Sequence, residues 1–298
     1  MAYIIGVDGG GTKTRFCLLN TSNNERDEVR TGETNFKNIG VFETKENISL
    51  GLSELLEKRN LEIKDIAYFV FGIAGCDTES DFITFKAILK EIEIEKNYSV
   101  FNDAKIAFRA CSNKNGMIFI SGTGSICFSY KGEKEKRIGG WGARFSDFGS
   151  GYWIGKKFLT DFLLYLEDLH ESDPIFEKFK NEFIKDKNPF EYVEDNFLDI
   201  KSTASITKFI LSADSEYVNN LADEVSHTFY KLAIHLNKDF ADEEIDLVLS
   251  GGVMKNEKIY TRIKNKIRNN DDLKNITVIL NDKESVEGSI NLALSFLK

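Results

Sequence analysis

Glycine residues gather at five places in this chain, and two of these places also carry a threonine and a polar or acidic neighbour. They are Asp8-Gly-Gly-Gly-Thr12 and Ser121-Gly-Thr-Gly-Ser125. Each follows one apolar run and precedes another, which predicts a strand, a tight turn and a second strand. Because glycine has no Cβ atom, backbone N–H groups in such a turn can approach a phosphate closely. The residue types therefore predict a clip for nucleotide phosphates, built from two turns.

Alternative roles for these glycines fit the sequence less well. Three consecutive glycines can be a plain hairpin turn, but the repetition favours a clip with one half in each of two domains. A Walker A loop does not fit, because Ser150–Lys157 begins with serine and ends with lysine. A dinucleotide-binding fingerprint does not fit either, because residues 9–14 lead into a strand rather than a helix.

Several residues beside these turns have side chains suited to a nucleotide and its metal. Asp8 ends the first apolar run, and hard carboxylate oxygens suit Mg²⁺, so we expect it to hold the metal through water. The hydroxyl groups of Thr12 and Thr123 add donors for phosphate oxygens. The candidate nucleotide contacts in the turns and in a later glycine pair are Gly10, Gly11, Thr12, Lys13, Gly122, Thr123, Gly251 and Gly252.

The elements that must position these residues alternate between strands and helices. Apolar runs predict strands over 3–8, 14–19, 26–33, 66–73, 98–101, 117–121, 125–130, 246–250 and 276–280. Helical spacing predicts helices over 38–59, 79–92, 104–110, 151–170, 174–185, 202–212, 216–240, 256–269 and 285–297. This alternation, with its hairpins, indicates the α/β class with mixed sheets. We expect domains over 1–112 and 113–284, with a final helix near 285–298 that packs back on the first domain.

Composition limits the kinds of partner. The 298 residues hold 39 Lys and Arg against 48 Asp and Glu, a formal net charge of −9. This charge argues against nucleic-acid binding through a broad basic surface. No apolar run is long enough for a membrane span and no basic leader begins the chain, so we expect a cytoplasmic protein. Cys17, Cys76, Cys111 and Cys127 form no close pair, and their apolar neighbours favour burial as small hydrophobic residues.

Seven motifs occur in an order that resembles a known family. They are Asp8-Gly-Gly-Gly-Thr12, Thr34-Asn35, Asn102-Asp103-Ala104, Ser121-Gly-Thr-Gly-Ser125, Gly139-Gly-Trp-Gly142, Asp147-Phe-Gly-Ser-Gly151 and Ser250-Gly-Gly252. Together they resemble the N-acetylglucosamine kinase / BadF-BadG-BcrA-BcrD ATPase family over essentially the whole chain. The resemblance implies two ribonuclease-H-like (actin-like ATPase) domains with mixed sheets and a cleft between them.

The resemblance also implies site residues. Contacts to an amino sugar would come from Asn35, Asp103, Ser125, Gly140, Trp141, Gly142 and Asp147, with the glycines of 139–142 and 149–151 forming a wall around the sugar. Thr12, Thr123, Gly252 and Asn256 would contact the nucleotide.

Phosphoryl transfer to a sugar hydroxyl needs a base, a metal ion and the exclusion of water. Asp103 stands where a strand ends and a helix opens, so it can act as the base; a plain helix N-cap is the alternative. Asn35 and Asp147 offer polar atoms to sugar hydroxyls, and ordinary turn residues are the alternative for both. Trp141 between glycines suits stacking on a sugar ring.

The predicted function is an ATP-dependent amino-sugar kinase in cell-wall salvage. The resemblance implies transfer of the γ-phosphate of ATP, with Mg²⁺, to the 6-hydroxyl of N-acetylglucosamine and of N-acetylmuramic acid. Its partners would be these small molecules, and a homodimer is a further expectation. A glucosamine kinase is one alternative. Another is an ATPase activator of a dehydratase, which in the wider family holds an iron–sulfur cluster between two subunits; the lack of closely spaced cysteines here counts against it.

Overall fold

The computed structural model describes residues 2–241 and 243–297, and it divides into two compact units. The first unit contains the chain up to Asn113 together with the segment from Asp282 onward. The second unit is the continuous segment Lys114–Asn281. The chain therefore leaves the first unit once, builds the second, and returns.

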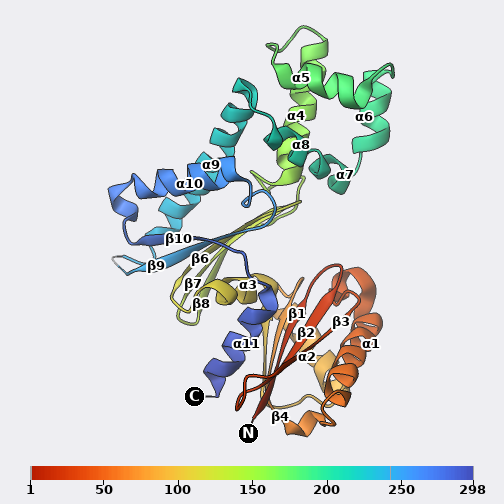
Figure 1. Cartoon of the computed structure of the whole chain (residues 1–298), viewed down its shortest axis with the longest axis vertical. Helices are drawn as coiled ribbons and strands as arrows, with labels where there is room; N and C mark the ends of the chain where they lie inside the picture. Colours follow the sequence, from red (N-terminus) through yellow and green to blue (C-terminus); the bar gives the residue numbers. More distant parts are fainter. Residues whose placement is uncertain (1, 242, 298) are drawn as a thin grey trace. The chain divides into compact units, whose positions relative to one another are not determined.

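The first unit contains a five-stranded mixed sheet (Figure 1). Its strands are β1 (Tyr3–Gly9), β2 (Thr14–Asn20), β3 (Arg26–Thr31), β4 (Ile66–Ile73) and β5 (Tyr98–Asn102). The order is β3-β2-β1-β4-β5; β1, β2 and β3 pair antiparallel, whereas β4 is parallel to both β1 and β5. The parallel strands β1, β4 and β5 consequently end at the same edge of the sheet.

Helices cover both faces of this sheet. On one face, α1 (Phe36–Glu57) and α2 (Glu79–Glu91) enclose a core that includes Phe16, Phe71 and Phe85. On the other, α3 (Asp103–Cys111) and α11 (Ser285–Phe296) pack over Cys17 and other apolar side chains. A short 3₁₀ turn, η1 (Ile63–Asp65), precedes β4.

The second unit repeats the sheet of the first. Its strands are β6 (Gly116–Ser121), β7 (Ser125–Lys131), β8 (Lys134–Gly139), β9 (Ile245–Ser250) and β10 (Ile276–Leu280), in the order β10-β9-β6-β7-β8. The antiparallel meander β6-β7-β8 and the parallel neighbours β9 and β10 match the first sheet strand for strand. The repeated glycine turns thus belong to two sheets of the same topology.

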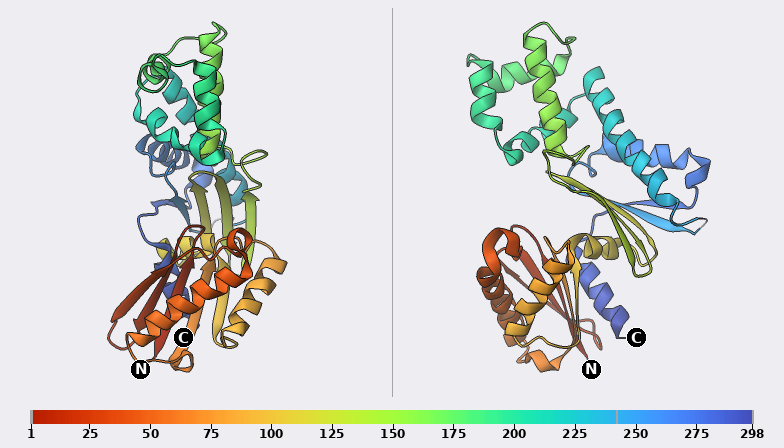
Figure 2. Two further views of the ribbon diagram at one scale, coloured as in Figure 1. Left: turned by 90° about the vertical axis from the view of Figure 1, so that its right-hand side faces the viewer. Right: turned by 180° about the vertical axis from the view of Figure 1, so that it is seen from behind.

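Most of the helices of the second unit lie between β8 and β9 in the chain. They are α4 (Gly151–Leu166), α5 (Pro174–Phe179), the π-helical turn η2 (Lys180–Ile184), α6 (Pro189–Phe197), α7 (Ile200–Ser205), α8 (Thr207–Ser212) and α9 (Glu216–Asn237). After β9 come α10 (Glu257–Arg268) and the 3₁₀ turn η3 (Asp271–Leu273). Figure 2 shows α4 to α8 gathered at one end of this unit, where aromatic side chains such as Phe158, Phe162 and Phe179 form a core. None of the helices in the described part of the chain is both long and apolar enough to cross a membrane.

The predicted elements agree with the structure except in and around this helical region. The helix expected over 202–212 is two helices separated at Ile206, and the helix expected over 174–185 ends in η2. Neither β8 nor α6 was predicted. Neither has a fully buried residue: β8 has the sequence KEKRIG, and the apolar side chains of α6 that pack against the core are only partly buried.

The contact between α11 and α3 yields a first prediction. A Cβ atom at Gly288 would lie 1.8 Å from the carbonyl oxygen of Ile106, so the two helix backbones touch at this point. Alanine usually stabilises a helix relative to glycine by about 1 kcal/mol. Here we expect Gly288→Ala to lower the free energy of unfolding by about 1–3 kcal/mol through overpacking, measured by urea denaturation. Ser295→Ala, on the exposed side of α11, is the control, and a stabilised G288A protein would contradict the packing described.

Candidate active site

Two acidic side chains lie at the edge of the first sheet where its parallel strands end. Asp8 is the penultimate residue of β1, and Asp103 directly follows β5. The register pairs Asp8 with Gly72 of β4, and the next residue, Ile73, with Asn102 of β5. The sheet therefore brings together two acidic residues that are far apart in the sequence.

Asp103 is not the N-cap of α3. Asn102 occupies that position, and its side-chain oxygen accepts a hydrogen bond from the backbone N–H of Ala104 at 2.8 Å. Burial raises the pKa of Asp103 to about 6, and the negative charge of Asp77 acts in the same direction, although the N–H of Ala104 favours the ionised form. Asn102, and not Asp103, is therefore the N-cap of α3. Asp103 is an ionisable group whose pKa lies close to neutral pH.

Asp8 is perturbed in the same way. Burial raises its pKa to about 6, and the carboxylate of Asp103 adds to the effect, while Arg15 and Lys13 oppose it. Two nearby groups of like charge favour a cation between or beside them. Among the described residues, no three His, Cys, Asp or Glu side chains gather into a metal site of their own. A single carboxylate fits the way Mg²⁺ is usually held, with water and substrate phosphates completing its ligands.

Asn35, the other predicted sugar contact in the first unit, is the N-cap of α1. Its side-chain oxygen accepts a hydrogen bond from the backbone N–H of Lys37 at 3.1 Å. The side chain lies against Gly75, where a Cβ atom would be 2.5 Å from that oxygen. Gly75 follows β4, so Asn35 lies near the same sheet edge as Asp8 and Asp103.

The first glycine turn joins β1 to β2 and is open to solvent. The N–H of Gly10 donates to the carbonyl oxygen of Lys13 at 3.1 Å, which closes the turn. Gly11, Thr12 and Lys13 are exposed. Their backbone and side-chain donors are therefore available to an anionic ligand.

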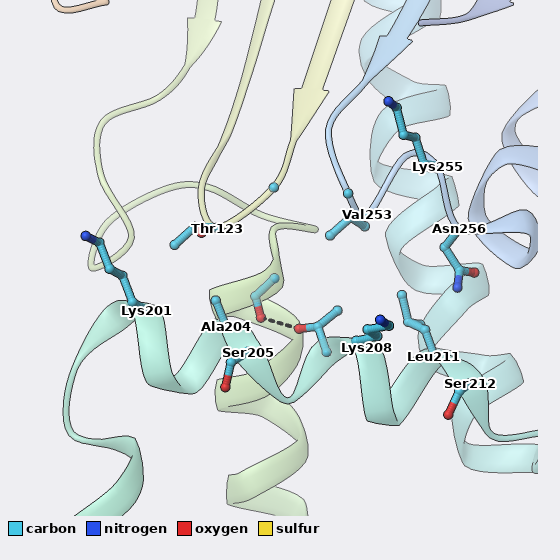
Figure 3. Close-up of a pocket in the computed structure, with 14 residues that line it drawn as sticks. Thr123, Lys201, Ala204, Ser205, Lys208, Leu211, Ser212, Val253, Lys255 and Asn256 are labelled. Carbon is cyan, nitrogen blue, oxygen red and sulfur yellow. Dashed lines mark hydrogen bonds between the residues drawn. The ribbon is translucent and has the colours of Figure 1, made fainter. Parts of the chain in front are cut away.

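The second glycine turn lines a pocket of about 760 Å³ that lies wholly within the second unit (Figure 3). Of the predicted nucleotide contacts, Gly122, Thr123, Gly252 and Asn256 line it. Gly251 does not. The structure thus brings four predicted residues together from two separate parts of the chain, the turn between β6 and β7 and the segment between β9 and α10.

The opposite wall of this pocket is a helical surface; the sequence predicted a helix over 202–212 but assigned none of its residues to the site. In Figure 3, α7 and α8 lie on one side of the pocket, and Thr123 and Val253 lie on the opposite side. The residues that line it from these helices are Lys201, Ala204, Ser205, Thr207, Lys208, Leu211 and Ser212. Apart from Thr207, they follow Lys201 at positions i+3, i+4, i+7, i+10 and i+11, the pattern of one helical face, so this face continues through the break at Ile206. That periodicity is the signal that could have identified this wall.

Close packing of α7 against α4 holds this wall in place. A Cβ atom at Gly155 of α4 would lie 2.1 Å from the carbonyl oxygen of Thr203. The Thr207 hydroxyl donates to the carbonyl oxygen of Gly151 at 2.7 Å, a bond drawn in Figure 3. The N–H of Gly151 in turn donates to the carbonyl oxygen of Gly122 at 2.7 Å. The helical wall and the glycine turn are therefore joined through the start of α4.

Gly149 and Gly151 were expected in a wall around the sugar, and the structure gives Gly151 a different position. Gly151 lines the pocket that contains Gly122, Thr123 and Gly252. Gly149 has φ +74° and packs against Phe229 of α9. The expectation grouped these glycines with Asp147 because they are adjacent in sequence, but α4 begins at Gly151 and leads the chain away.

Asp147 is held tightly in the loop between β8 and α4. Its φ of +61° is in the left-handed region, and its carboxylate accepts hydrogen bonds from the backbone N–H groups of Ser125 and Gly142. A Cβ atom at Gly124 would lie 2.7 Å from Oδ2. Burial raises the pKa of Asp147, and Oδ1 is buried without a hydrogen-bond partner. Three predicted sugar contacts thus meet here, around a carboxylate oxygen that is buried and has no hydrogen-bond partner.

Trp141 and Gly140 complete the predicted sugar contacts. The Trp141 side chain is 74% exposed, and the Arg137 guanidinium lies 5.2 Å from its ring centroid. The same guanidinium donates to the carbonyl oxygen of Gly140 at 2.5 Å. The guanidinium contact helps to fix the exposed Trp141 ring, which offers an apolar surface on which a sugar can stack.

Comparisons with known proteins identify the family of the chain. The profile of the BadF/BadG/BcrA/BcrD ATPase family matches residues 5–290, so the chain belongs to that family. An N-acetylmuramic acid/N-acetylglucosamine kinase of Clostridium acetobutylicum is 31% identical over 218 residues, 72% of this chain and 71% of the relative. An N-acetyl-D-glucosamine kinase of Dictyostelium discoideum is 32% identical over 170 residues, 53% of each chain.

Among solved structures, a candidate N-acetylglucosamine kinase of Chromobacterium violaceum superposes with a TM-score of 0.70 at 20% identity, covering 99% of both chains. This similarity concerns the fold. The family predicted from the seven motifs is confirmed, and so is the mixed α/β class.

The two adjacent glycines after β9 give a second prediction. A Cβ atom at Gly252 would meet nothing within 4 Å, whereas at Gly251, with φ +94°, it would lie 2.3 Å from the carbonyl oxygen of Ser121. We expect Gly252→Val to fill the pocket and weaken ADP binding about tenfold or more in calorimetry, with an unchanged melting temperature. Gly251→Ala should instead destabilise the fold by about 1–3 kcal/mol. Wild-type ADP affinity in G252V would contradict the prediction that this pocket binds the nucleotide.

Proposed function

We propose that this chain is an ATP-dependent sugar kinase that transfers the γ-phosphate of ATP to the 6-hydroxyl of N-acetylglucosamine, and also of N-acetylmuramic acid. The observation that carries the proposal is Asp103, a half-buried carboxyl group at the start of a helix with its pKa raised to about 6. Such a group can remove a proton from a hydroxyl at neutral pH. Family membership and the two curated relatives support the class of reaction.

In the proposed reaction, the oxygen of the sugar hydroxyl attacks the γ-phosphorus of ATP, and the carboxylate of Asp103 accepts the proton of that hydroxyl. The bond between that phosphorus and the bridging oxygen breaks, and ADP leaves. The 760 Å³ pocket of the second unit would hold the nucleotide, with Gly122 and Thr123 directed to its phosphates. The exposed turn at Gly11 and Thr12 would supply the remaining backbone and hydroxyl donors.

Asp8 fits a role as the protein's link to Mg²⁺, held through water. When bound, the metal ion neutralises charge on the phosphates during transfer. A cation beside Asp8 would also favour its ionised form, against the burial and the repulsion by Asp103 that raise its pKa. Asp8 in this proposal orients the ion and does not take part in proton transfer.

The proposed sugar contacts are Asn35 in the first unit, and Asp147 and Trp141 in the second. Asn35 offers its side-chain amide to hydroxyl groups, and Asp147 contributes a carboxylate whose Oδ1 is buried and has no hydrogen-bond partner. Trp141 offers an apolar face to the sugar ring. Such a set recognises a polyhydroxy ring by hydrogen bonds along its edge and contact on its face.

The proposal extends to the setting of the reaction. We place the enzyme in the cytoplasm, in the salvage of cell-wall amino sugars, and its assembly as a homodimer stays a prediction. Glucosamine is the alternative substrate within the same class. An ATPase activator with a shared iron–sulfur cluster is less well supported, because Cys17, Cys76 and Cys127 are buried, and burial raises the pKa of Cys17 to about 11 and of Cys76 to about 12.

A panel of sugars tests the proposal. We expect ADP release with N-acetylglucosamine, and ³¹P and ¹³C NMR of the product should show phosphate on O6. Asp103→Asn keeps the shape of the side chain and removes the base, so kcat should fall by about 10²–10⁴. Asp27→Asn, on the edge strand β3, is the control. Full activity of D103N would show that Asp103 is not the base. Turnover of glucosamine alone would show that glucosamine, and not N-acetylglucosamine, is the substrate.

The raised pKa predicts how activity depends on pH. Asp103 must be ionised to accept a proton, and its pKa is about 6. The value of kcat/KM for the sugar, measured at saturating Mg-ATP, should therefore be level above pH about 7 and fall about tenfold per pH unit below pH about 6. A profile that stays level down to pH about 4.5 would show that no group with this pKa acts in the reaction.

A further inference from the structure

A short segment of the first unit, residues 74–78, lies between the starts of α1 and α3. It joins β4 to α2. On one side, Gly75 has φ +87° and packs directly against the side chain of Asn35. On the other, the side-chain amide of Asn102 donates to the carbonyl oxygen of Cys76 at 3.3 Å and to the carboxylate of Asp77 at 2.9 Å. This segment therefore touches both Asn35 and the residue that precedes Asp103.

The carboxylate of Asp81, in the first turn of α2, fixes the shape of this segment. Its Oδ2 atom accepts hydrogen bonds from the backbone N–H groups of Asp77 at 3.1 Å and Thr78 at 2.8 Å. Lys37 of α1 donates to the same oxygen at 2.7 Å. Although burial acts in the opposite direction, these hydrogen bonds lower the pKa of Asp81 to about 2. The carboxylate is thus ionised at any pH at which a kinase works.

The contacts form a continuous chain between two parts of the proposed sugar site. Lys37 lies two residues after Asn35, in the first turn of α1, and its ammonium group is also 3.9 Å from the carboxylate of Asp77. Asn102 immediately precedes Asp103 and caps α3. A shift of the 74–78 segment would therefore alter the separation of Asn35 and Asp103.

We propose that Lys37, Asp77 and Asn102 are positioning residues that hold Asn35 and Asp103 at the separation required to bind and deprotonate one sugar. The inference rests on the proposed function of those two residues. None of the three needs to touch the sugar: they act through the segment at 74–78. Misplacement of a reacting group by about 1 Å can lower a rate about 100-fold, so a network of this kind governs activity through geometry.

Two lysines on α1 allow a matched test. Lys37 and Lys45 both form an ion pair with α2: Lys37 with Asp81 at 2.7 Å, and Lys45 with Glu91 at 3.1 Å. The Lys37 pair belongs to the network, whereas the Lys45 pair is at the other end of α2. We expect Lys37→Met to lower kcat/KM for the sugar about tenfold or more, with KM for ATP within about twofold of wild type. Lys45→Met should leave both values unchanged.

Rescue and a second variant complete the test. Lys37→Arg keeps a positive donor for Asp81 and should restore most of kcat/KM. A role of Lys37 in stability alone would instead lower the melting temperature of K37M and leave the kcat/KM of its folded fraction at the wild-type value for the sugar. Asp77→Ala removes the partner of Asn102 and should reproduce the sugar-specific defect. The proposal is overturned if wild type is active and K37M and D77A keep wild-type sugar kinetics, or if KM for ATP rises equally. A wild type that binds no amino sugar in calorimetry overturns the proposed function together with it.

Discussion

Parallel neighbouring strands end at one edge of a sheet, and in both units the groups suited to chemistry are attached at that edge. In the first unit these are Asp8 and Asp103; in the second, the turn at Gly122 and the glycine pair after β9. The constraint carries an electrostatic consequence. Acidic side chains at such an edge lie in partly buried, like-charged surroundings, which raises the pKa of both Asp8 and Asp103 to about 6. A cation beside Asp8 would oppose this rise and favour its ionised form.

The glycines at these edges serve different physical purposes even where they are adjacent. Gly251 adopts a positive φ and lets β9 approach Ser121, whereas Gly252 leaves space that a ligand can occupy. Gly75 and Gly124 admit a polar side chain, Asn35 and Asp147 respectively, against the backbone. The site is therefore made as much by the absence of side chains as by the few that line it.

The sequence was most informative where a local pattern repeats. Two glycine turns flanked by apolar runs predicted both hairpins, and the repetition agrees with two sheets of identical strand order. The same repetition could have indicated β8, which is the counterpart of β3. The residues of β8 are mostly polar because it is an exposed edge strand, so they show no alternation of apolar and polar residues. The helical wall at 201–212 was harder to predict. Its periodicity indicates one helical face, but only the packing of α7 on Gly155 brings that face to the pocket. The N-cap role of Asn102 could not be distinguished from that of Asp103 by residue type, since both are favoured there.

The return of the chain to the first unit determines when each unit can fold during synthesis. The second unit is one continuous segment, whereas the core beneath α3 is completed by Val286 and Ile290 of α11. A ribosome therefore releases every residue of the second unit before it releases the helix that closes the first. The part of the chain made first must wait with this face of its sheet covered by α3 alone. An interrupted polypeptide that lacks α11 would present the rest of that apolar face to chaperones and proteases.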